Sequence, residues 1–599
     1  MDTMSRLQGI LSNGVPVSRR DVLKRGAVIT VSVPVVASLL AACGGSSNEK
    51  AATSTPSEAR PTATQGVVPT TGTGGGGGSA SPTTSASPEA GGGAGTPIKG
   101  GTMVVQGHQE IASLHPDDQG PTVHYVMIRA IHEPLIDLDY DYQIVPILAE
   151  SYEAAPDGTK YTFKMHSGVT WQDGQPLTSK DAKYNVDWYK DPANAAVMGS
   201  DFAEVGDVET PDDTTIVINM TKVNAAFLAG VMPAMMLVPE HIQSKTGKDN
   251  YTSQATGTGP FKLKEWVAAE QTTLEAYDNY WGGRANIDTY REEVVPEGSV
   301  RAIALRTGKS DFAVWPVQAE DNLKFIQEAK FDVNRAAGTA VNHFPLNNQK
   351  PSLSDKVVRQ AMMTAIDRDR LINDLEKGLA VKATANLSPA VVFFYNPDVT
   401  KYDHNPDAAK KLLDDAGYAP GSDGIREKNG VKLTFTCTVI TGDQRRRPEA
   451  EVVQQDLKAI GIDMQIDEKP VATILDGLPK GTLDASLFNW TYGVSEPDAR
   501  TTLRSDASRN FSSYRNPEMD KLLDDGVHTV DPTERQRIYK EIQAIIAEDV
   551  PFLYIMFWED IGVWNKRIQG RPEHANNSNY FYANVYKFWI DESLDSSKA

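Results

Sequence analysis

Hydrophobic and polar positions alternate in several short segments beyond residue 100, and this period of two predicts β-strands. We predict such strands over residues 102–105, 161–165, 214–219 and 432–439. In the last segment Leu433, Phe435, Cys437 and Val439 fall on one face of the strand. Cys437 is therefore expected to be a buried core thiol rather than a nucleophile.

Other segments repeat apolar residues every three or four positions, which predicts amphipathic helices. One apolar stripe lies within residues 354–366. Asn405 followed by Pro406 predicts the start of a second helix, and Gly417 predicts its end. Asp531, three residues before Glu534, predicts the capped start of a third. Strands that alternate with helices over so long a segment indicate an α/β body of two or more lobes.

Length and composition narrow the classes of function. The chain has 599 residues, too many for a single hydrophobic core, and its formal net charge of −20 would repel nucleic acid. Its two cysteines, Cys43 and Cys437, exclude a disulfide framework, and no Cys/His spacing indicates zinc. Neither a nucleophile elbow nor a metalloprotease motif occurs, so we assign no catalytic residue, no metal and no cofactor.

The first 43 residues have the pattern of an export signal. Ser-Arg-Arg-Asp-Val-Leu-Lys at 18–24 resembles a twin-arginine motif through Arg19 and Arg20. The apolar run at 27–42 that comes next is shorter than the roughly 20 residues of a spanning helix. Leu-Ala-Ala-Cys at 40–43 resembles a bacterial lipobox, in which the cysteine receives lipid. We predict a signal peptide over 1–42 and a lipid anchor on Cys43; a non-cleaved membrane anchor is the alternative.

Residues 44–97 contain no aromatic residue, no Leu and no Ile. A segment of Gly, Ser, Thr, Pro and Ala cannot bury enough apolar surface to offset the entropy lost on ordering. We therefore predict that residues 43–97 form a flexible linker behind the lipidated cysteine. Such a linker would hold the folded body on the outer face of the cytoplasmic membrane, within reach of a membrane partner.

From residue 100 onwards, short motifs succeed one another in a familiar order. They include GGTMVV at 100–105, PILAESY at 146–152, GVTW at 168–171, GTGPF at 257–261, NYWGG at 279–283 and VRQA at 358–361. In this order they resemble the family 5 solute-binding proteins of bacterial ABC importers, over residues 100–590. The resemblance implies a non-enzymatic monomer that captures a small polar solute and delivers it to ABC permease subunits.

The resemblance also implies an α/β, two-lobed periplasmic-binding-protein-like fold with mixed sheets, an extra small subdomain and a hinged cleft. Lobe 1 would comprise residues 98–139, 255–345 and 560–592. The inserted subdomain would comprise residues 140–254, and lobe 2 residues 346–559. Solute would contact both lobes only in the closed state, so that binding shifts the hinge equilibrium.

Residues 489–498 resemble the family's Gly-Trp-x-x-Asp-Tyr-x-Asp-Pro segment, which implies solute contacts by Asn489, Trp490, Thr491 and Tyr492. In the family's peptide binders the aspartate of this segment meets the peptide α-ammonium, but the matching position here is Gly493. Trp490 and Tyr492 could instead stack on a sugar ring or an apolar side chain.

Three further residues are predicted solute contacts: Glu110 and Ile111 after the first strand, and Trp558 near the return to lobe 1. Oligopeptides or similar polar solutes are the first expectation, and an oligosaccharide or another metabolite is the alternative. A secreted hydrolase and a structural envelope lipoprotein are the remaining alternatives, from other classes of protein.

Overall fold

The computed structural model describes residues 95–598, apart from gaps at 109, 112, 119–121, 140–141, 314–317, 444, 494–495 and 573–583. The predicted export signal with Arg19 and Arg20, the predicted lipid site Cys43 and nearly all of the predicted linker lie outside the described residues. Within the described ranges, no helix has the length and apolarity that crossing a membrane requires.

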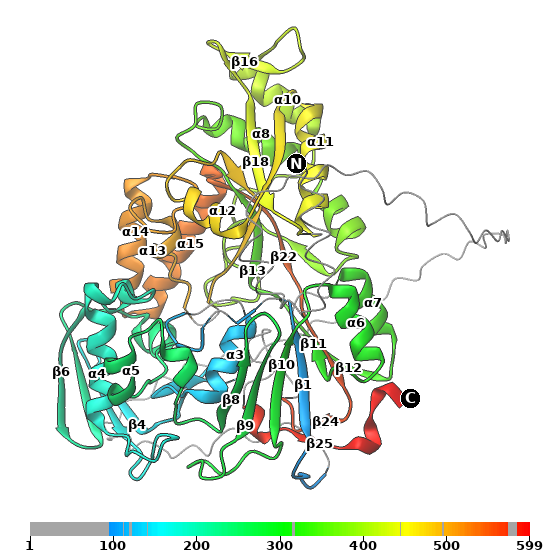
Figure 1. The fold of residues 1–599 in the computed structure, drawn as a ribbon. Coiled ribbons are helices and arrows are strands. Elements are labelled where there is room, and N and C mark those ends of the chain that lie inside the picture. Colours follow the sequence, from blue (N-terminus) through cyan, green and yellow to red (C-terminus); the bar gives the residue numbers. More distant parts are fainter. Residues whose placement is uncertain are drawn as a thin grey trace, which may run out of the picture. The chain divides into compact units, whose positions relative to one another are not determined.

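A mixed seven-stranded sheet forms lobe 1, with strand order β12-β23-β11-β1-β10-β9-β8 (Figure 1). β1 runs parallel to β10 and β11, and the other pairings are antiparallel. The strands are β1 (Thr102–Gly107), β8 (Phe261–Val267), β9 (Gln271–Ala276), β10 (Thr289–Val294), β11 (Phe312–Ala313), β12 (Phe331–Ala336) and β23 (Asp560–Asn565). Its helices are α3 (Thr122–Ile131), α6 (Gly298–Arg306) and α7 (Ala319–Gln327). Met103, Val105 and Trp564 are buried in its core.

The subdomain has its own antiparallel sheet, in the order β4-β5-β7-β6, and its own core around Phe163, Trp171 and Ile216. The strands are β4 (Ala149–Ala154), β5 (Lys160–Met165), β6 (Val205–Asp212) and β7 (Thr215–Met220). The hairpin β2 (Ile136–Leu138) and β3 (Ile144–Pro146) precedes them, and α4 (Ser179–Lys190) and α5 (Glu240–Thr246) complete the subdomain.

Lobe 2 contains a four-stranded sheet in the order β14-β22-β13-β21 and a parallel sheet in the order β19-β18-β20. The first is built from β13 (Ala340–Pro345), β14 (Ala380–Lys382), β21 (Phe488–Thr491) and β22 (Phe552–Trp558). The second is built from β18 (Thr434–Ile440), β19 (Asp463–Lys469) and β20 (Ala485–Ser486). Every residue of β22 is buried, which its continuous apolar sequence requires.

Helices pack around these two sheets (Figure 1). They are α8 (Lys356–Ala365), α10 (Pro406–Asp415), α11 (Arg446–Ala459), α12 (Val471–Gly477), α13 (Arg500–Leu503), α14 (Pro517–His528) and α15 (Pro532–Asp549). The predicted caps are confirmed, because Asn405 accepts from the Ala408 N–H and Asp531 from the Glu534 N–H. The four predicted strands are confirmed as parts of β1, β5, β7 and β18, and burial raises the pKa of the Cys437 thiol.

Two short connections cross between the seven-stranded and four-stranded sheets, and we call them the crossover. Residues 337–339 join β12 to β13, and Glu559 joins β22 to β23. β12 pairs with β23 and β13 pairs with β22, so the two connections run side by side. A Cβ atom on Gly338 would lie 1.6 Å from the carbonyl oxygen of Trp558, so this close approach requires glycine.

The crossover corrects one predicted boundary. The division at residue 345 placed β13 in lobe 1, but β13 hydrogen-bonds to β21 and β22 in the lobe 2 sheet. Phe344 is buried in the lobe 2 core, and this packing decides the assignment. We therefore count β13 as part of lobe 2; the other predicted boundaries stay predictions.

Glu292 on β10 is an acidic residue buried in the interior of lobe 1. Its side chain is 1% exposed, and in the described part of the chain neither carboxylate oxygen has a hydrogen-bond partner. Burial raises the pKa of Glu292 well above its ordinary value. The folded protein therefore retains a proton that the unfolded chain releases above about pH 4.5, so stability falls as the pH rises from there.

Replacing Glu292 by Leu should stabilise the protein by about 2 kcal/mol at pH 7.5, because the folded protein no longer has to take up a proton that the unfolded chain has released. Near pH 3, where the unfolded chain also holds that proton, most of this gain should vanish. Urea unfolding at the two pH values measures it. Glu293→Gln is the matched control, since Glu293 is the next residue on β10 and is partly exposed. Equal gains at both pH values would contradict the titration account.

Candidate solute-binding site

Trp490 lies on β21, the edge strand of the four-stranded sheet, opposite Val341 of β13. Its indole is half-buried, and the ring edge of Phe511 meets it at a centroid distance of 6.1 Å. The Arg509 guanidinium lies over the indole, 5.3 Å from its centroid. Thr491, the next residue, is exposed. Trp490 thus offers an aromatic surface with a cation beside it.

Tyr492 is placed differently from Trp490, although both belong to the predicted solute segment. Its ring is buried among residues of α14 and α15, and its hydroxyl lies 3.2 Å from the hydroxyl of Thr502. Gly493 comes next, at the position of the family's amine-binding aspartate. A Cβ atom there would lie 2.7 Å from the carbonyl oxygen of Glu496, so this backbone conformation leaves no room for a side chain.

Two arginines at the start of α11 connect predicted site residues that are far apart in the sequence. Arg445 lies over the Trp558 ring at 4.0 Å and forms an ion pair with Glu376. Arg446 donates to the side-chain oxygen of Asn489 and forms an ion pair with Asp443. Sequence reasoning missed both arginines; the run of three arginines at 445–447 is the signal that could have found them.

A buried carboxyl lies behind these arginines. Glu449, in the first turn of α11, accepts from the Asn342 side-chain amide of β13. Burial raises the pKa of Glu449 and the Glu376 carboxylate adds to the effect, while Arg445 and Arg446 oppose it. Burial thus disfavours a charge on Glu449, and the charge of the α11 start comes mainly from the arginines and their two partners.

The remaining predicted residues lie on lobe 1. Ile111 is 2% exposed and belongs to the lobe 1 core, and Glu110 beside it is exposed. Asn489 and Trp558 therefore contact neighbouring arginines of lobe 2, whereas Trp490 lies in the same sheet but contacts Phe511 and Arg509. Glu110 and Ile111 lie on the other lobe. Trp558 is 2% exposed, so in this conformation Arg445 covers its ring.

The subdomain meets lobe 2 through a set of charged side chains. Glu204 and Arg500 come from opposite sides of this boundary and lie 3.1 Å apart. His528 at the end of α14 also reaches Glu204, at 3.3 Å. The Ala225 N–H donates to the Val527 carbonyl at 2.8 Å, which adds a backbone bond across the same boundary. We call this boundary the closure contact.

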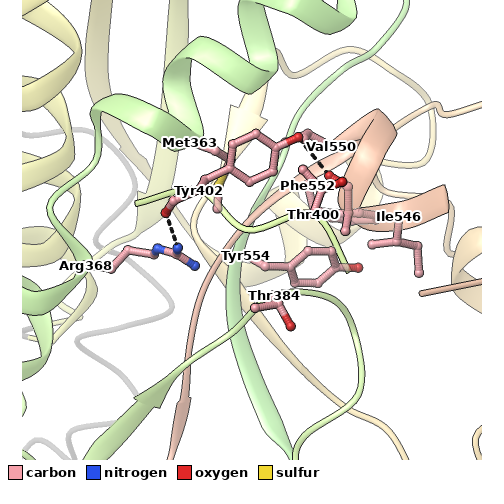
Figure 2. Close-up of a pocket in the computed structure, with 10 residues that line it drawn as sticks. Met363, Arg368, Thr384, Thr400, Tyr402, Ile546, Val550, Phe552 and Tyr554 are labelled. Carbon is pink, nitrogen blue, oxygen red and sulfur yellow. Dashed lines mark hydrogen bonds between the residues drawn. The ribbon is translucent and has the colours of Figure 1, made fainter. Parts of the chain in front are cut away.

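Lobe 2 also has a small recess, of about 10 Å³, that is unsuited to solute (Figure 2). Tyr402, Tyr554 and Arg368 line it, and Arg368 donates to the Tyr402 carbonyl at 2.6 Å. A space of this size holds roughly one water molecule. This recess is therefore too small to hold a peptide or a sugar.

Comparison with known proteins identifies the relatives of this architecture. The family model for bacterial extracellular solute-binding proteins, family 5, middle region, matches residues 143–511, more than half of the chain. The chain belongs to this family. Oligopeptide-binding protein AppA of Bacillus subtilis, also a solute-binding protein by name, is 27% identical over 515 residues, covering 83% of this chain and 93% of AppA.

Other comparisons place the family 5 protein among proteins named for different solutes. The structure of AppA with a nonapeptide matches with a TM-score of 0.76 and 25% identity, over 83% of this chain and 100% of AppA. Glutathione-binding protein GsiB of Shigella flexneri is 25% identical over 485 residues, covering 78% of this chain and 91% of GsiB. NikZ of Campylobacter jejuni, solved with Ni(L-His), has a TM-score of 0.74 at 23% identity over 82% of this chain and 99% of NikZ, and shows the fold alone.

These findings confirm two predictions. The fold is the α/β periplasmic-binding-protein fold with mixed sheets, as in AppA. The family is one of solute-binding proteins, so the chain binds its solute and does not transform it. Among the described residues, no group of three His, Cys, Asp or Glu side chains is placed to hold a metal ion.

Proposed function

We propose that this protein captures a small peptide-like solute outside the cytoplasmic membrane and delivers it to ABC permease subunits. Family membership over residues 143–511 is the observation that carries the proposal. The names of two relatives, an oligopeptide-binding protein and a glutathione-binding protein, support peptide-like solutes. The protein acts as a monomer that closes around its cargo and needs no cofactor.

Closure takes place at the crossover, because only residues 337–339 and Glu559 lead from lobe 1 to lobe 2. Solute bridges the lobes in the closed state and so favours it. Asn489, Trp490 and Thr491 contact the solute from lobe 2, and Glu110 contacts it from lobe 1. Three buried predicted residues, Ile111, Tyr492 and Trp558, shape the site from behind.

The amino-terminal region supplies the signals for export and for membrane anchoring. Arg19 and Arg20 direct export, and the mature chain begins at Cys43, which carries the lipid. Acyl chains on one residue give stable anchoring at about 0.8 kcal/mol for each buried methylene. The linker over 43–97 then lets the folded body reach a permease in the same membrane.

An oligosaccharide is the second candidate solute, and one observation favours it. Gly493 supplies no carboxylate for a peptide α-ammonium, and the backbone there leaves no room for one. The half-buried indole of Trp490 is also a suitable surface for a sugar ring. Neutral sugars therefore belong in every binding test.

Binding of solute should slow hydrogen exchange at Ala225, whose amide bonds across the closure contact. The probe is a pool of synthetic peptides of two to nine residues with free termini, compared with maltose and raffinose. Native mass spectrometry of the protein purified from cell envelopes supplies the mass of retained cargo. Neither a bound mass nor slower exchange with any probe would contradict the proposed function.

Replacing Arg500 by Gln should weaken solute binding about threefold to tenfold, because the Glu204 ion pair favours the closed state and is partly exposed. Titration calorimetry with a binding peptide measures the change. Arg504→Gln is the matched control, since Arg504 pairs with Asp506 and Asp524 within lobe 2. Equal losses in both variants would mean that the closure contact plays no part.

A further inference from the structure

Charged side chains gather where the subdomain approaches lobe 2, and most of them are paired. The pairs are Glu204–Arg500, Asp498–Arg500, Glu204–His528 and Glu496–Arg535. Burial raises the pKa of Glu496 to about 7, while Arg535 opposes that rise. In such a desolvated place an unpaired charge is costly. Any charge left over here therefore points to a missing partner.

Arg509 is one such charge, on the lobe 2 side. Its side chain is half-buried and lies over the Trp490 indole. No carboxylate in the described part of the chain forms an ion pair with it, whereas neighbouring Arg500 and Arg504 each have two. In a chain with 79 acidic residues, an unpaired and half-buried arginine is a ready receptor for an anionic group.

Asp201 is the opposite charge, on the subdomain side. It lies in the short helix Gly199–Phe202, is half-buried, and has no ion pair or side-chain hydrogen bond among the described residues. Burial, together with the smaller effect of the Asp498 carboxylate, raises the pKa of Asp201 to about 6. The Arg509 guanidinium is near enough to oppose that rise, although no ion pair joins the two side chains.

We propose that Arg509 and Asp201 are the two charged anchors of a zwitterionic solute, with the solute carboxylate on Arg509 and its ammonium on Asp201. The inference rests on the proposed function and specifies its solute class. Trp490 lies under the carboxylate end and contacts the adjoining apolar part of the solute. A charged pair separated across the boundary between subdomain and lobe 2 is satisfied only when the two sides close on such a solute.

A solute that carries both charges would pair with both Arg509 and Asp201, whereas a solute with one charge would pair with only one of them. An anion alone would bind Arg509 but would be repelled by Asp201. A cation alone would leave Arg509 without a partner. The ammonium of a peptide also needs an acceptor other than residue 493, which is glycine, and Asp201 supplies a carboxylate from the other side of the site.

The test pairs solute chemistry with residue changes. The peptide pool with free termini is compared with the same pool N-acetylated or C-amidated, in thermal-shift and calorimetric assays. Arg509→Gln should lower affinity for free-acid peptides about ten- to a hundredfold, the cost of a charge-assisted hydrogen bond. It should also abolish the preference for the acid over the amide. Asp201→Asn should abolish the preference for the free amine over the acetylated peptide.

Two matched variants control for charge and folding. Arg515→Gln removes an exposed arginine of lobe 2, and Asp207→Asn removes an exposed aspartate of the subdomain. Both should retain wild-type affinity and both preferences. Circular dichroism and unfolding midpoints establish that the four variants fold, so a loss of preference reports on the anchor itself.

Acidification supplies an independent readout. The charges that act on Asp201 are those of Asp498, Arg500 and Arg509 of lobe 2 and of Glu204 of its own subdomain, and His528 contacts Glu204. Protonation of Asp201 removes the acceptor for the ammonium, so affinity should fall about tenfold between pH 7 and pH 5. Asp201→Asn should lose the part of this difference that Asp201 causes, because His528 and the other groups are the same in both proteins.

Several outcomes would overturn the inference. Sugars or doubly blocked peptides that stabilise the protein as well as free peptides would do so, while leaving solute capture intact. Persistence of both preferences in the Arg509 and Asp201 variants would also overturn it. Absence of binding by every peptide in the pool would overturn it as well, and the mass of the retained cargo would then show whether solute capture itself survives.

Discussion

Replacement of Gly338 by Ala should lower the free energy of unfolding by about 3 kcal/mol or more. The new Cβ atom would lie 1.6 Å from the Trp558 carbonyl oxygen, which belongs to the main chain and cannot move aside alone. The crossover connections must therefore separate, and this disturbs pairing between β13 and β22. Urea unfolding measures the loss, and peptide binding reports whether closure is altered as well.

Ala337→Ser is the matched control for this change. Ala337 lies in the same connection but is exposed, so a hydroxyl there meets water. The control should unfold like wild type within about 0.5 kcal/mol, as surface changes usually do. A Gly338→Ala protein as stable as this control would mean that the two connections are free to move apart at little cost.

Replacement of Arg359 by Met should destabilise the protein by about 4 kcal/mol. Arg359 on α8 is 4% exposed, and its guanidinium donates to four main-chain carbonyls. Those carbonyls belong to Leu353, Ser354, Asp549 and Val550, at 2.7–3.2 Å. Methionine fills the volume but leaves these carbonyls without donors. Each buried carbonyl without a hydrogen-bond donor costs about 1–3 kcal/mol before the structure relaxes.

The two carbonyls at Asp549 and Val550 lie at the carboxyl end of α15, where a cation is favourable. Loss of Arg359 should therefore loosen the end of α15 first, and hydrogen exchange in this helix should rise along with the change in urea stability. Val357→Met is the matched control, because Val357 lies on α8, is partly exposed and has an apolar side chain that makes no hydrogen bond to α15. A similar loss in the control would assign the effect to α8 rather than to the guanidinium.

Local signals predicted individual elements well because their physics is local. The side chains of Asn405 and Asp531 each accept a hydrogen bond from a free N–H group at a helix start, and Pro406 has no N–H that needs a partner. Neither effect depends on the surrounding structure. The alternation of apolar and polar residues in β18 likewise predicted the buried face that contains Cys437. The boundary at residue 345 failed because strand pairing, which no local pattern encodes, assigned β13 to lobe 2.

The candidate site was predicted in part. Residue types and the family resemblance singled out Asn489, Trp490 and Trp558, but nothing in the sequence linked them to Arg445 or Arg446. Those contacts form because the fold places the start of α11 beside β21 and β22, two strands that come much later in the chain. Tyr492 shows the converse, since its neighbours on α14 and α15 turn it into the core.

By itself, the sequence determined the features that depend only on the order of residues. These are the absence of aromatic residues, Leu and Ile over residues 44–97, the alternation of strands and helices, and the missing carboxylate at Gly493. The tertiary structure alone decided which charges find partners. Arg500 meets Glu204 across nearly three hundred residues, whereas Arg509 and Asp201 remain unpaired among the residues that the structure describes. Charge is a property of each residue, but its desolvation and pairing depend on which distant segments the fold brings together.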